Sequence, residues 1–381
     1  MRFEKGNVMA NGSDDLTGRS LVAVDPDLPA SRIDAFVSWL GSLQVKASLG
    51  PFPLVDIEKF TELGIAVVPL PPTMIEALLE AFPFAGVSVG PERALRIPSG
   101  GDVIGVGSHA NILDAMNVKT TPSGAVKVCV LDTGYAPHPD FNGRVILSDP
   151  LGTNTTMDTR GHGMQCIGLA CGPLAPYDGS KRYGMAYGST ILNGHVVSVV
   201  GVVCDCTIIR GIQWAAQQGA AVVNISAGTT PYLGGYSAQM EAAALRAKRN
   251  NVLVIAAAGN NSEGVGNLPV THPANCPSIM AVAALDHQLK PWKYSCMTVY
   301  ANQRVDIAAP GEMIRTSYLN GGFKELSGTS AASALVSGVA ALWASTNLAY
   351  RGQALWDVLI AKALPMTGQE PQVGAGMVQA P

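Results

Sequence analysis

The stretch Leu326–Trp343, with the sequence LSGTSAASALVSGVAALW, decides how this chain folds. From Ser330 onward its residues are small or apolar on every face and no charge occurs before Arg351, a pattern typical of a helix that is buried all round. The first N–H groups of such a helix lack partners and carry the positive end of its dipole, so a serine there lies in an anion-stabilising position. Ser330 is therefore a candidate nucleophile, although Gly-Thr-Ser before an apolar helix is also an ordinary helix cap.

A nucleophilic serine needs a base and an acid that orients the base. Asp132 follows the apolar, β-branched run Ala125–Leu131. The C-terminal end of a buried parallel strand is where α/β folds place catalytic groups, but an Asp before Gly is also typical of a turn. His162 stands between two glycines at the start of a small-residue helix, an open and rigid position, whereas most lone histidines have structural roles. Both residues are candidates, and each retains a structural alternative.

Strand-like and helix-like segments alternate through the middle of the chain. The strand-like runs are Thr190–Leu192, Ala221–Ser226 and Val252–Ala258, and the helix-like segments are Thr207–Ala216 and Ser237–Asn250. This alternation predicts an α/β fold with a doubly wound parallel sheet and helices on both faces. Asn260 follows the last of these strands, where its amide can either form a turn or donate a hydrogen bond into a neighbouring site.

The pattern of strand-like and helix-like segments in residues 19–98 predicts a separate structural unit. Strand-like runs cover Ser20–Val24, Gly64–Leu70 and Val87–Val89, amphipathic helices begin near Pro29 and Pro72, and one more strand fits between the first helix and Gly64. The order strand, helix, strand, strand, helix, strand predicts a small α+β sandwich resembling a ferredoxin-like unit. The junction Ile97–Asp102 predicts a boundary between domains of residues 1–100 and 101–381, with a short helix around His109–Ala115 opening the second. We expect roughly the first 18 residues to be disordered.

Composition limits the partners. The chain has 381 residues, 48% hydrophobic and 14% charged, with a net charge of -3, so no electrostatic reason exists to expect nucleic acid or an anionic membrane. Arg246, Lys248 and Arg249 are interpreted as a solvated helix end. No apolar run has the length of a signal peptide or a membrane span, which predicts a cytoplasmic location as written, or secretion if the N-terminus is incomplete.

The seven cysteines are predicted to be structural. They are Cys129, Cys166, Cys171, Cys204, Cys206, Cys276 and Cys296. None forms a CxxC pair, and Cys204 and Cys206 have no companion cluster at zinc-site spacing. Buried or paired cysteines are therefore favoured over metal ligands.

Four motifs together carry a resemblance to a known family. They are Asp132-Thr133-Gly134, Gly161-His162-Gly163, Ala257-Ala258-Gly259-Asn260 and Gly328-Thr329-Ser330. In this order and approximate spacing they resemble the subtilisin-like serine proteases (subtilases, the peptidase S8 family), over roughly residues 102–381. The N-terminal unit is similar in pattern to the inhibitor-like (I9) propeptide of the same family. The chain departs from the family pattern at Met164, Gln165, Ala331 and Ala334, none of which removes a catalytic group.

The resemblance implies roles for individual residues. Ser330 would be the nucleophile, His162 the base, Asp132 the orienting acid and Asn260 the side-chain donor of the oxyanion hole. The resemblance also implies a set of substrate-binding residues: Ser226, Ala227, Gly228, Ala257, Ala258, Gly259 and Thr271. No acidic residue occurs in this set, which argues against selection for Arg or Lys before the cut. Many relatives bind structural calcium, and Asp140 matches one ligand position, although the loop Pro173–Ser180 differs from the usual ligand loop.

The implied function is hydrolysis of peptide bonds by a serine endopeptidase that needs no cofactor for its chemistry. Its partners would be polypeptide substrates and its own N-terminal propeptide, an intramolecular inhibitor removed by autocleavage near Pro98–Asp102. Two alternatives remain open: a processing protease specialised for one partner peptide, and a catalytically silent binding protein on the same scaffold. An α/β-hydrolase is excluded because its acid and histidine follow the serine, whereas here the order is Asp, His, Ser.

Overall fold

The computed structural model describes residues 16–46, 57–81, 84–96, 112–119, 124–198, 201–229, 235–262 and 266–381. The junction expected to separate two domains, the autocleavage region at 98–102 and residues 1–15 all lie outside the described residues. The last three of the roughly 18 residues expected to be disordered, residues 16–18, instead belong to a strand that begins at Leu16. The short helix expected near residue 110 is described as α3 (Ile112–Ala115). None of the helices in these ranges combines the length and apolarity needed to cross a membrane.

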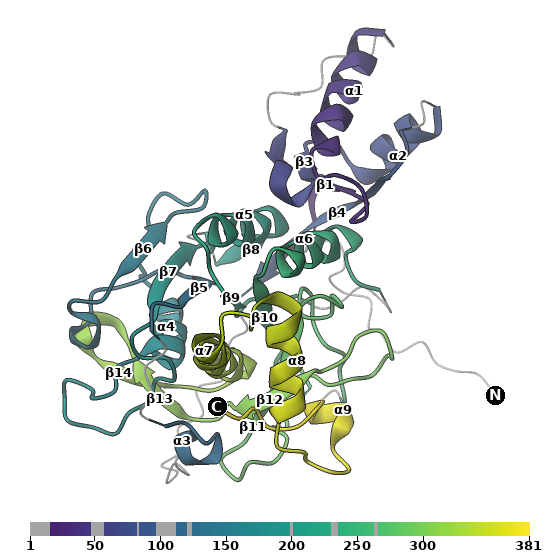
Figure 1. The fold of residues 1–381 in the computed structure, drawn as a ribbon. Coiled ribbons are helices and arrows are strands. Elements are labelled where there is room, and N and C mark those ends of the chain that lie inside the picture. Colours follow the sequence, from purple (N-terminus) through teal and green to yellow (C-terminus); the bar gives the residue numbers. More distant parts are fainter. Residues whose placement is uncertain are drawn as a thin grey trace.

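An antiparallel sheet with two helices forms the N-terminal part of the chain (Figure 1, purple and blue). Its elements are β1 (Leu16–Val24), α1 (Arg32–Lys46), β2 (Glu58–Phe60), β3 (Ile65–Val68), α2 (Pro72–Ala81) and β4 (Val87–Arg96). The strand order is β2-β3-β1-β4, and the short strand β8 (Val202–Cys204) continues the sheet beyond β4. This sequence of elements is the one that the periodicity predicts, with β2 as the additional strand.

A seven-stranded sheet forms the centre of the molecule, in the order β12-β11-β10-β9-β5-β7-β6, and all its pairings are parallel. The strands are β5 (Lys127–Asp132), β6 (Ile146–Asp149), β7 (Thr190–His195), β9 (Val222–Ile225), β10 (Leu253–Ala257), β11 (Met280–Leu285) and β12 (Ile307–Pro310). Every residue of β9, β10, β11 and β12 is buried, as expected for strands covered on both faces. The predicted doubly wound α/β fold is confirmed.

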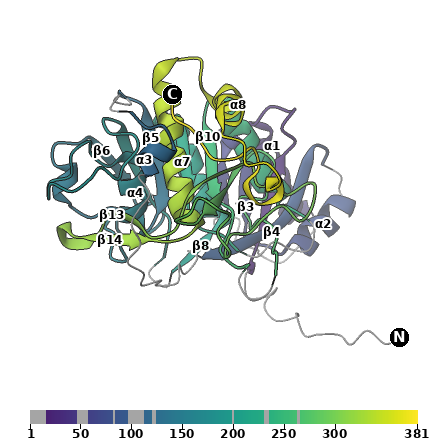
Figure 2. The same ribbon diagram turned by 90° about the horizontal axis from the view of Figure 1, so that it is seen from below.

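Helices cover both faces of this sheet (Figures 1 and 2). On one face lie α4 (His162–Cys171), α7 (Thr329–Thr346) and α8 (Gly352–Lys362), and on the other lie α5 (Asp205–Gln217) and α6 (Ala238–Arg249). Successive strand residues alternate between the two cores: Val128 and Val130 face α4 and α7, whereas Cys129 and Leu131 face α5. Helix α7 is buried from Thr329 to Leu342, as its composition predicts.

The remaining elements are short. They comprise the antiparallel pair β13 (Ile314–Ser317) and β14 (Phe323–Leu326), the single turns η2 (Thr61–Leu63), η3 (Pro139–Phe141) and η4 (Leu319–Gly321), and α9 (Glu370–Val373). Cys204 and Cys206 form a disulfide, and the other five cysteines are buried thiols, consistent with structural roles.

The N-terminal sheet packs against α5 and α6, and this contact corrects one prediction. Arg246 is not solvated: it is buried, and its Nη2 donates to the carbonyls of Asp25 at 2.9 Å and Leu28 at 3.0 Å. On the same side, Arg210 on α5 pairs with Glu58 of β2. A positive residue in the last turn of a helix is usually solvated, so only the docked sheet reveals this role.

Candidate active site

The predicted acid, base and nucleophile lie at one edge of the central sheet, where one strand ends and two helices begin. Asp132 is the last residue of β5, His162 the first residue of α4, and Ser330 the second residue of α7. Helix α4 packs on β5 and on α7, which brings the starts of both helices to the C-terminal end of β5. This edge is where parallel α/β sheets place their functional groups.

His162 and Asp132 are hydrogen-bonded. The Nδ1 atom of His162 lies 2.8 Å from Oδ1 and 3.0 Å from Oδ2 of Asp132, whose side chain is almost fully buried. Because a carboxylate accepts hydrogen bonds and cannot donate them, Nδ1 carries the proton. The Nε2 atom of a neutral His162 therefore has a lone pair available for a hydroxyl proton.

Backbone contacts around α4 hold the imidazole in place. Gly163 N donates to Thr133 Oγ1 at 2.7 Å, and a Cβ atom on Gly163 would stand only 2.4 Å from the carbonyl oxygen of Gly134, so this position must be glycine. Buried Asp158 accepts the N–H groups of Arg160 and Gly161 at 2.8 Å and that of Met164 at 2.9 Å. The sequence analysis missed Asp158, although an Asp shortly before a helix is a signal for a cap.

Ser330 Oγ lies 3.5 Å from the carbonyl oxygen of Ser226, and the structure shows no hydrogen bond between Ser330 and His162. Catalytic hydrogen bonds are often long until substrate binds. Cys166 is a second residue that the sequence analysis missed. It lies between His162 and Ser226, with its Sγ 3.8 Å from His162 Nδ1 and 3.6 Å from Ser226 Oγ. Burial raises the pKa of this thiol, so it remains protonated at neutral pH.

Asn260 is oriented by Thr329, the residue before Ser330. The Asn260 Oδ1 atom accepts from Thr329 N at 2.9 Å and from Thr329 Oγ1 at 2.7 Å. Its Nδ2 atom is buried and has no hydrogen-bond partner in the described structure. Buried donors are almost always bonded, so an unpaired donor beside a candidate nucleophile indicates a position that a ligand atom fills.

Four of the predicted substrate-binding residues, Gly228, Ala258, Gly259 and Thr271, lie together. Thr271 N and Thr271 Oγ1 both donate to Ala258 O, at 2.9 and 3.1 Å. Added Cβ atoms would meet the Thr271 side chain at 2.9 Å from Gly228 and at 2.5 Å from Gly259. The segments that contain Gly228 and Gly259 can approach Thr271 this closely because neither residue has a side chain.

Strand β4 pairs with Gly228, one of these residues. Arg96 N donates to Gly228 O at 3.0 Å, and Gly228 N donates to Arg96 O at 2.8 Å. On its other side Arg96 lies opposite Val202 of β8, with Leu95 opposite Val203. The N-terminal part of the chain thus forms the middle strand between β8 and Gly228.

The charge of Asp132 sets the proton affinity of His162. Burial of the ring opposes its charged form, but Asp132 outweighs this effect, and the pKa of His162 lies well above its usual value. Only neutral His162 can accept a proton, so an activity that uses His162 as its base is lost as the pH falls through this raised pKa.

We therefore expect the acid limb of kcat/KM to have its midpoint above pH 6.5, roughly the pKa of an unperturbed histidine. The measurement is kcat/KM against pH from 5 to 11 with a peptide substrate. His287→Gln, which removes an exposed histidine paired with Glu312, is the matched control and leaves the limb in place. A limb at or below pH 6 in the parent enzyme contradicts this assignment.

The predicted calcium ligand Asp140 accepts a hydrogen bond from a protein donor on each of its two carboxylate oxygens. Tyr177 N donates to its Oδ1 and the Tyr183 hydroxyl to its Oδ2, both at 2.6 Å. His138 donates from Nε2 to Gly322 O and accepts Asp140 N–H at Nδ1, so it adds no anionic ligand. Burial, with Asp140 next in effect, raises the pKa of Tyr183, so its hydroxyl retains the proton.

The surroundings of Asp140 also disfavour a cation. Asp178, in the neighbouring loop, pairs with Arg315 at 2.5 Å, and that guanidinium lies 3.7 Å from the ring centre of Phe323, which packs on His138. Calcium takes six to eight oxygen ligands at about 2.4 Å. The residues described around Asp140 do not fit such a shell.

We expect Tyr183→Phe, which removes the hydroxyl donor to Asp140, to lower the free energy of unfolding by about 2 kcal/mol. The decrease should be the same in calcium and in EDTA, because protein donors take the place of the ion. Thermal unfolding in both buffers measures it, with Tyr300→Phe at an exposed tyrosine as the control. A parental melting temperature that rises with calcium, and no longer does so in Asp140→Asn, contradicts this interpretation.

Comparisons with known proteins agree with the fold described above. The sequence model of the Subtilase family matches residues 123–376. M-protease of Shouchella clausii is 33% identical over 267 residues, which cover 70% of this chain and 66% of that protein. Subtilisin Savinase of Lederbergia lenta is 32% identical over 267 residues, covering 70% of this chain and 93% of that protein.

Solved structures of peptidases have a similar fold. A mutant of the protease domain of PatA is 29% identical, with a TM-score of 0.59 over 68% of this chain and 95% of that chain. Sphericase shares the fold, with a TM-score of 0.61 over 75% of this chain and 99% of that chain at 24% identity. The fold and the matches define a serine-type peptidase. The chain belongs to the subtilase family.

Proposed function

We propose that this chain is a serine endopeptidase that cleaves peptide bonds through Ser330, His162 and Asp132. The observation that carries the proposal is the pairing of His162 Nδ1 with both oxygens of Asp132, at the sheet edge where α7 presents Ser330. This pairing keeps the ring proton on Nδ1 and leaves Nε2 unprotonated. Activation of a serine nucleophile needs this tautomer, because Nε2 must accept the hydroxyl proton.

The reaction follows from these positions. Ser330 Oγ attacks the peptide carbonyl while His162 Nε2 takes the hydroxyl proton, and Asp132 stabilises the imidazolium. The carbonyl oxygen becomes an oxyanion, to which Asn260 Nδ2 and the Ser330 N–H donate. His162 returns the proton to the leaving amine as the C–N bond breaks and an acyl-enzyme forms. Water, activated by the same base, then hydrolyses the ester and regenerates Ser330.

Peptide substrates would bind in an extended conformation in the place of β4. The Arg96–Gly228 pair and the β4–β8 ladder form main-chain hydrogen bonds of the kind that any extended peptide can make. The side chain of Leu95 is fully buried in this arrangement, whereas Arg96 is exposed. We expect alternate side chains of a bound peptide to be buried against the enzyme in the same way.

The chain is by the same reasoning a zymogen whose N-terminal part inhibits the site until it is cleaved off. In support, β4 pairs with β8 and with Gly228, and Arg246 on α6 and Arg210 on α5 bind residues of the N-terminal sheet and its loops. The proposed cleavage lies at 98–102, a few residues after Arg96. Intact mass during incubation of the purified full chain tests this, and loss of roughly the first hundred residues is the expected result.

A fluorophosphonate label tests the catalytic proposal directly. It forms a covalent bond only with an activated serine, so peptide mapping should find one adduct on Ser330 in the processed enzyme. Quenched peptides should be hydrolysed by the same preparation. A chain that neither reacts with the label nor cleaves any peptide would instead be a binding protein on this scaffold.

A further inference from the structure

A disulfide joins Cys204 and Cys206 at the start of α5, with only Asp205 between them. Cys204 is the N-cap of the helix and Cys206 is its second residue. The stabilisation that a disulfide provides by restricting the unfolded chain increases with the length of the loop that it closes. A loop with a single intervening residue gains little in this way, so stability alone does not account for the bond.

This three-residue loop lies against β4, the last strand of the N-terminal sheet (Figure 1). Each of its residues has one partner on that strand: Cys204 lies opposite Ala94 in the antiparallel ladder, Asp205 Oδ2 accepts Arg93 N at 3.1 Å, and Cys206 N donates to Glu92 Oε1 at 3.2 Å. The three contacts follow one another in order along both segments. The loop that the disulfide closes therefore fixes where β4 binds at the start of α5.

The other oxygen of Asp205 attaches the loop to the catalytic part of the chain. Asp205 Oδ1 accepts a hydrogen bond from His272 Nε2 at 2.7 Å, and both side chains are fully buried. Because Oδ1 is engaged in this way, Oδ2 keeps its direction toward the Arg93 N–H. A change in the shape of the loop therefore breaks contacts with β4, because the loop cannot move together with that strand.

Two charged residues of the N-terminal sheet cover the sulfur atoms. Arg19 Nη2, on β1, lies 3.2 Å from Cys206 Sγ and 3.9 Å from Cys204 Sγ. The same guanidinium binds Glu92, with Nε 2.7 Å from Oε2 and Nη2 2.9 Å from Oε1. The Glu92 side chain is fully buried, whereas that of Arg19 is 35% exposed. The sulfur atoms therefore lie beneath a contact of the N-terminal sheet that is itself close to solvent.

The two sulfur atoms differ in accessibility. Cys204 is half-buried, whereas Cys206 is 3% exposed. A thiolate of a small dithiol therefore attacks Cys204 Sγ, and the S–S bond breaks with Cys206 as the leaving thiolate. The Arg19 guanidinium and the N-terminus of α5 both stabilise that thiolate. The second thiol of the reagent then displaces Cys204, so the reagent ends as a disulfide and its two protons end on the two cysteines.

We propose that the Cys204–Cys206 disulfide is a site of thiol–disulfide exchange with a dithiol, and that its reduction weakens the binding of the N-terminal sheet to α5. Two thiol sulfur atoms must lie farther apart than two bonded ones, in a space that Arg19 and Glu92 close. The loop then cannot keep all three of its contacts with β4. The site itself is independent of the proposed peptidase function, although in a zymogen its reduction would relieve inhibition.

The test uses the full-length chain with Ser330→Ala, so that cleavage does not complicate the measurement, with and without dithiothreitol. Hydrogen exchange followed by mass spectrometry should become roughly tenfold faster in β4 and in the first turn of α5 after reduction. Exchange in the β1–β3 pairs and in the central sheet should not change, which distinguishes a local effect from unfolding.

Thiol labelling shows whether the disulfide is the group that reacts. The other cysteines are buried, and burial raises the pKa of each of their thiols: Cys129, Cys166, Cys171, Cys276 and Cys296. Iodoacetamide should therefore label Cys204 and Cys206 in the folded chain, and only after treatment with the dithiol. Peptide mapping identifies the labelled residues.

Two variants complete the experiment. The double variant Cys204→Ser and Cys206→Ser should show the faster exchange in β4 without any dithiol, and the dithiol should have no further effect on it. Cys171→Ser, which changes a buried thiol at the end of α4, should keep the parental response to the dithiol. A response that is lost in Cys171→Ser but kept in the double variant contradicts the proposal.

The outcomes separate this proposal from the peptidase function. Resistance of Cys204 and Cys206 to dithiothreitol in the folded chain overturns the proposal, and so does unchanged exchange in β4 after complete reduction. Neither readout depends on peptide cleavage, so both remain decisive if the parental chain cleaves nothing. If the parental chain does cleave peptides, the dithiol should also shorten the time before hydrolysis begins.

Discussion

Ser330→Ala is expected to abolish peptide hydrolysis, with kcat reduced roughly a million-fold, a magnitude taken from the corresponding change in subtilisin. The physical reason is that Ser330 Oγ is the atom that forms the acyl-enzyme in the proposed mechanism, and alanine has no group that can take its place. If the zymogen proposal holds, the variant should also stay at its full length of 381 residues while the parent is shortened. Stopped and continuous peptide assays measure the first effect, and intact mass the second.

A matched serine on the same helix controls for folding. Ser345→Ala, near the C-terminal end of α7, removes a hydroxyl that donates only to Leu342 O, so activity and processing should be unchanged. Because alanine is the better helix former, neither variant should lose α7. Hydrolysis or fluorophosphonate labelling that survives in Ser330→Ala would show that a different residue is the nucleophile.

Asn260→Ala should lower kcat by about 100- to 1000-fold, with a smaller change in KM, a range again taken from subtilisin. The geometry gives the reason: Thr329 binds Asn260 Oδ1 twice, which fixes the amide plane and leaves Nδ2 buried without a partner. A donor that is oriented before the reaction stabilises the oxyanion without a cost of reorganisation. Its loss affects the transition state more than the bound substrate.

Two further variants separate the effect of losing the hydrogen-bond donor from the effect of changing the size of the side chain. Asn260→Asp keeps the size of the side chain but replaces the donor by a negative acceptor, so its kcat should be at least as low as that of Asn260→Ala. Thr329→Val removes one of the two contacts to Oδ1 and should give an intermediate loss. A kcat within threefold of the parent in Asn260→Ala would place the oxyanion elsewhere, a threshold of about 0.7 kcal/mol.

The parallel sheet could be predicted because its strands are buried on both faces. Runs such as Val252–Ala258 and Ala221–Ser226 are continuous apolar segments bounded by polar residues, and they correspond to β10 (Leu253–Ala257) and β9 (Val222–Ile225). Three strands of the same sheet, β6, β11 and β12, were not predicted individually, and neither were the three-residue strand β8 and the pair β13 and β14. Their pairing depends on distant partners and leaves little periodicity in the local sequence.

The remaining differences between the predictions from sequence and the structure arise from contacts between segments that are distant in the chain. The sequence predicts a strand near Val87–Val89, but β4 extends to Arg96 because β8 and Gly228 provide hydrogen-bond partners on both sides. Arg246 was interpreted as solvated because a positive charge in a last helical turn usually is. The docked N-terminal sheet instead covers it with backbone carbonyls.

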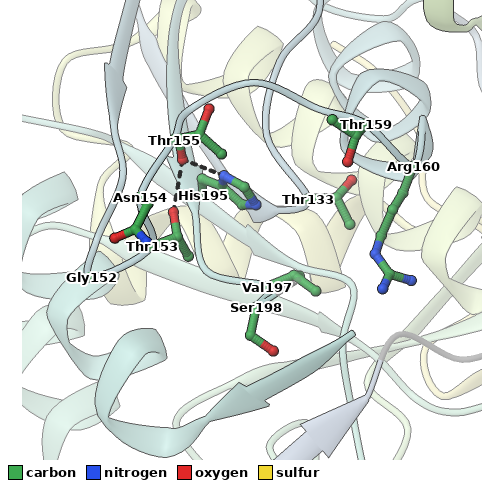
Figure 3. A pocket seen from close by; sticks show the side chains of 10 residues that line it. All are labelled: Thr133, Gly152, Thr153, Asn154, Thr155, Thr159, Arg160, His195, Val197 and Ser198. Carbon is green, nitrogen blue, oxygen red and sulfur yellow. Dashed lines mark hydrogen bonds between the residues drawn. The ribbon is translucent and has the colours of Figure 1, made fainter. Parts of the chain in front are cut away.

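The sequence by itself determined the fold class, the family and the identity of the residues that meet at the sheet edge. Helix and strand periodicity, and motifs such as Gly328-Thr329-Ser330, are local properties of the chain. Only the tertiary structure decided that Thr329 orients Asn260, that protein donors bind both oxygens of Asp140, and that Arg160 lines a cavity beside Asp132 and His162 (Figure 3). Hydrogen-bond partners and cavities join segments far apart in the chain, so no local pattern specifies them.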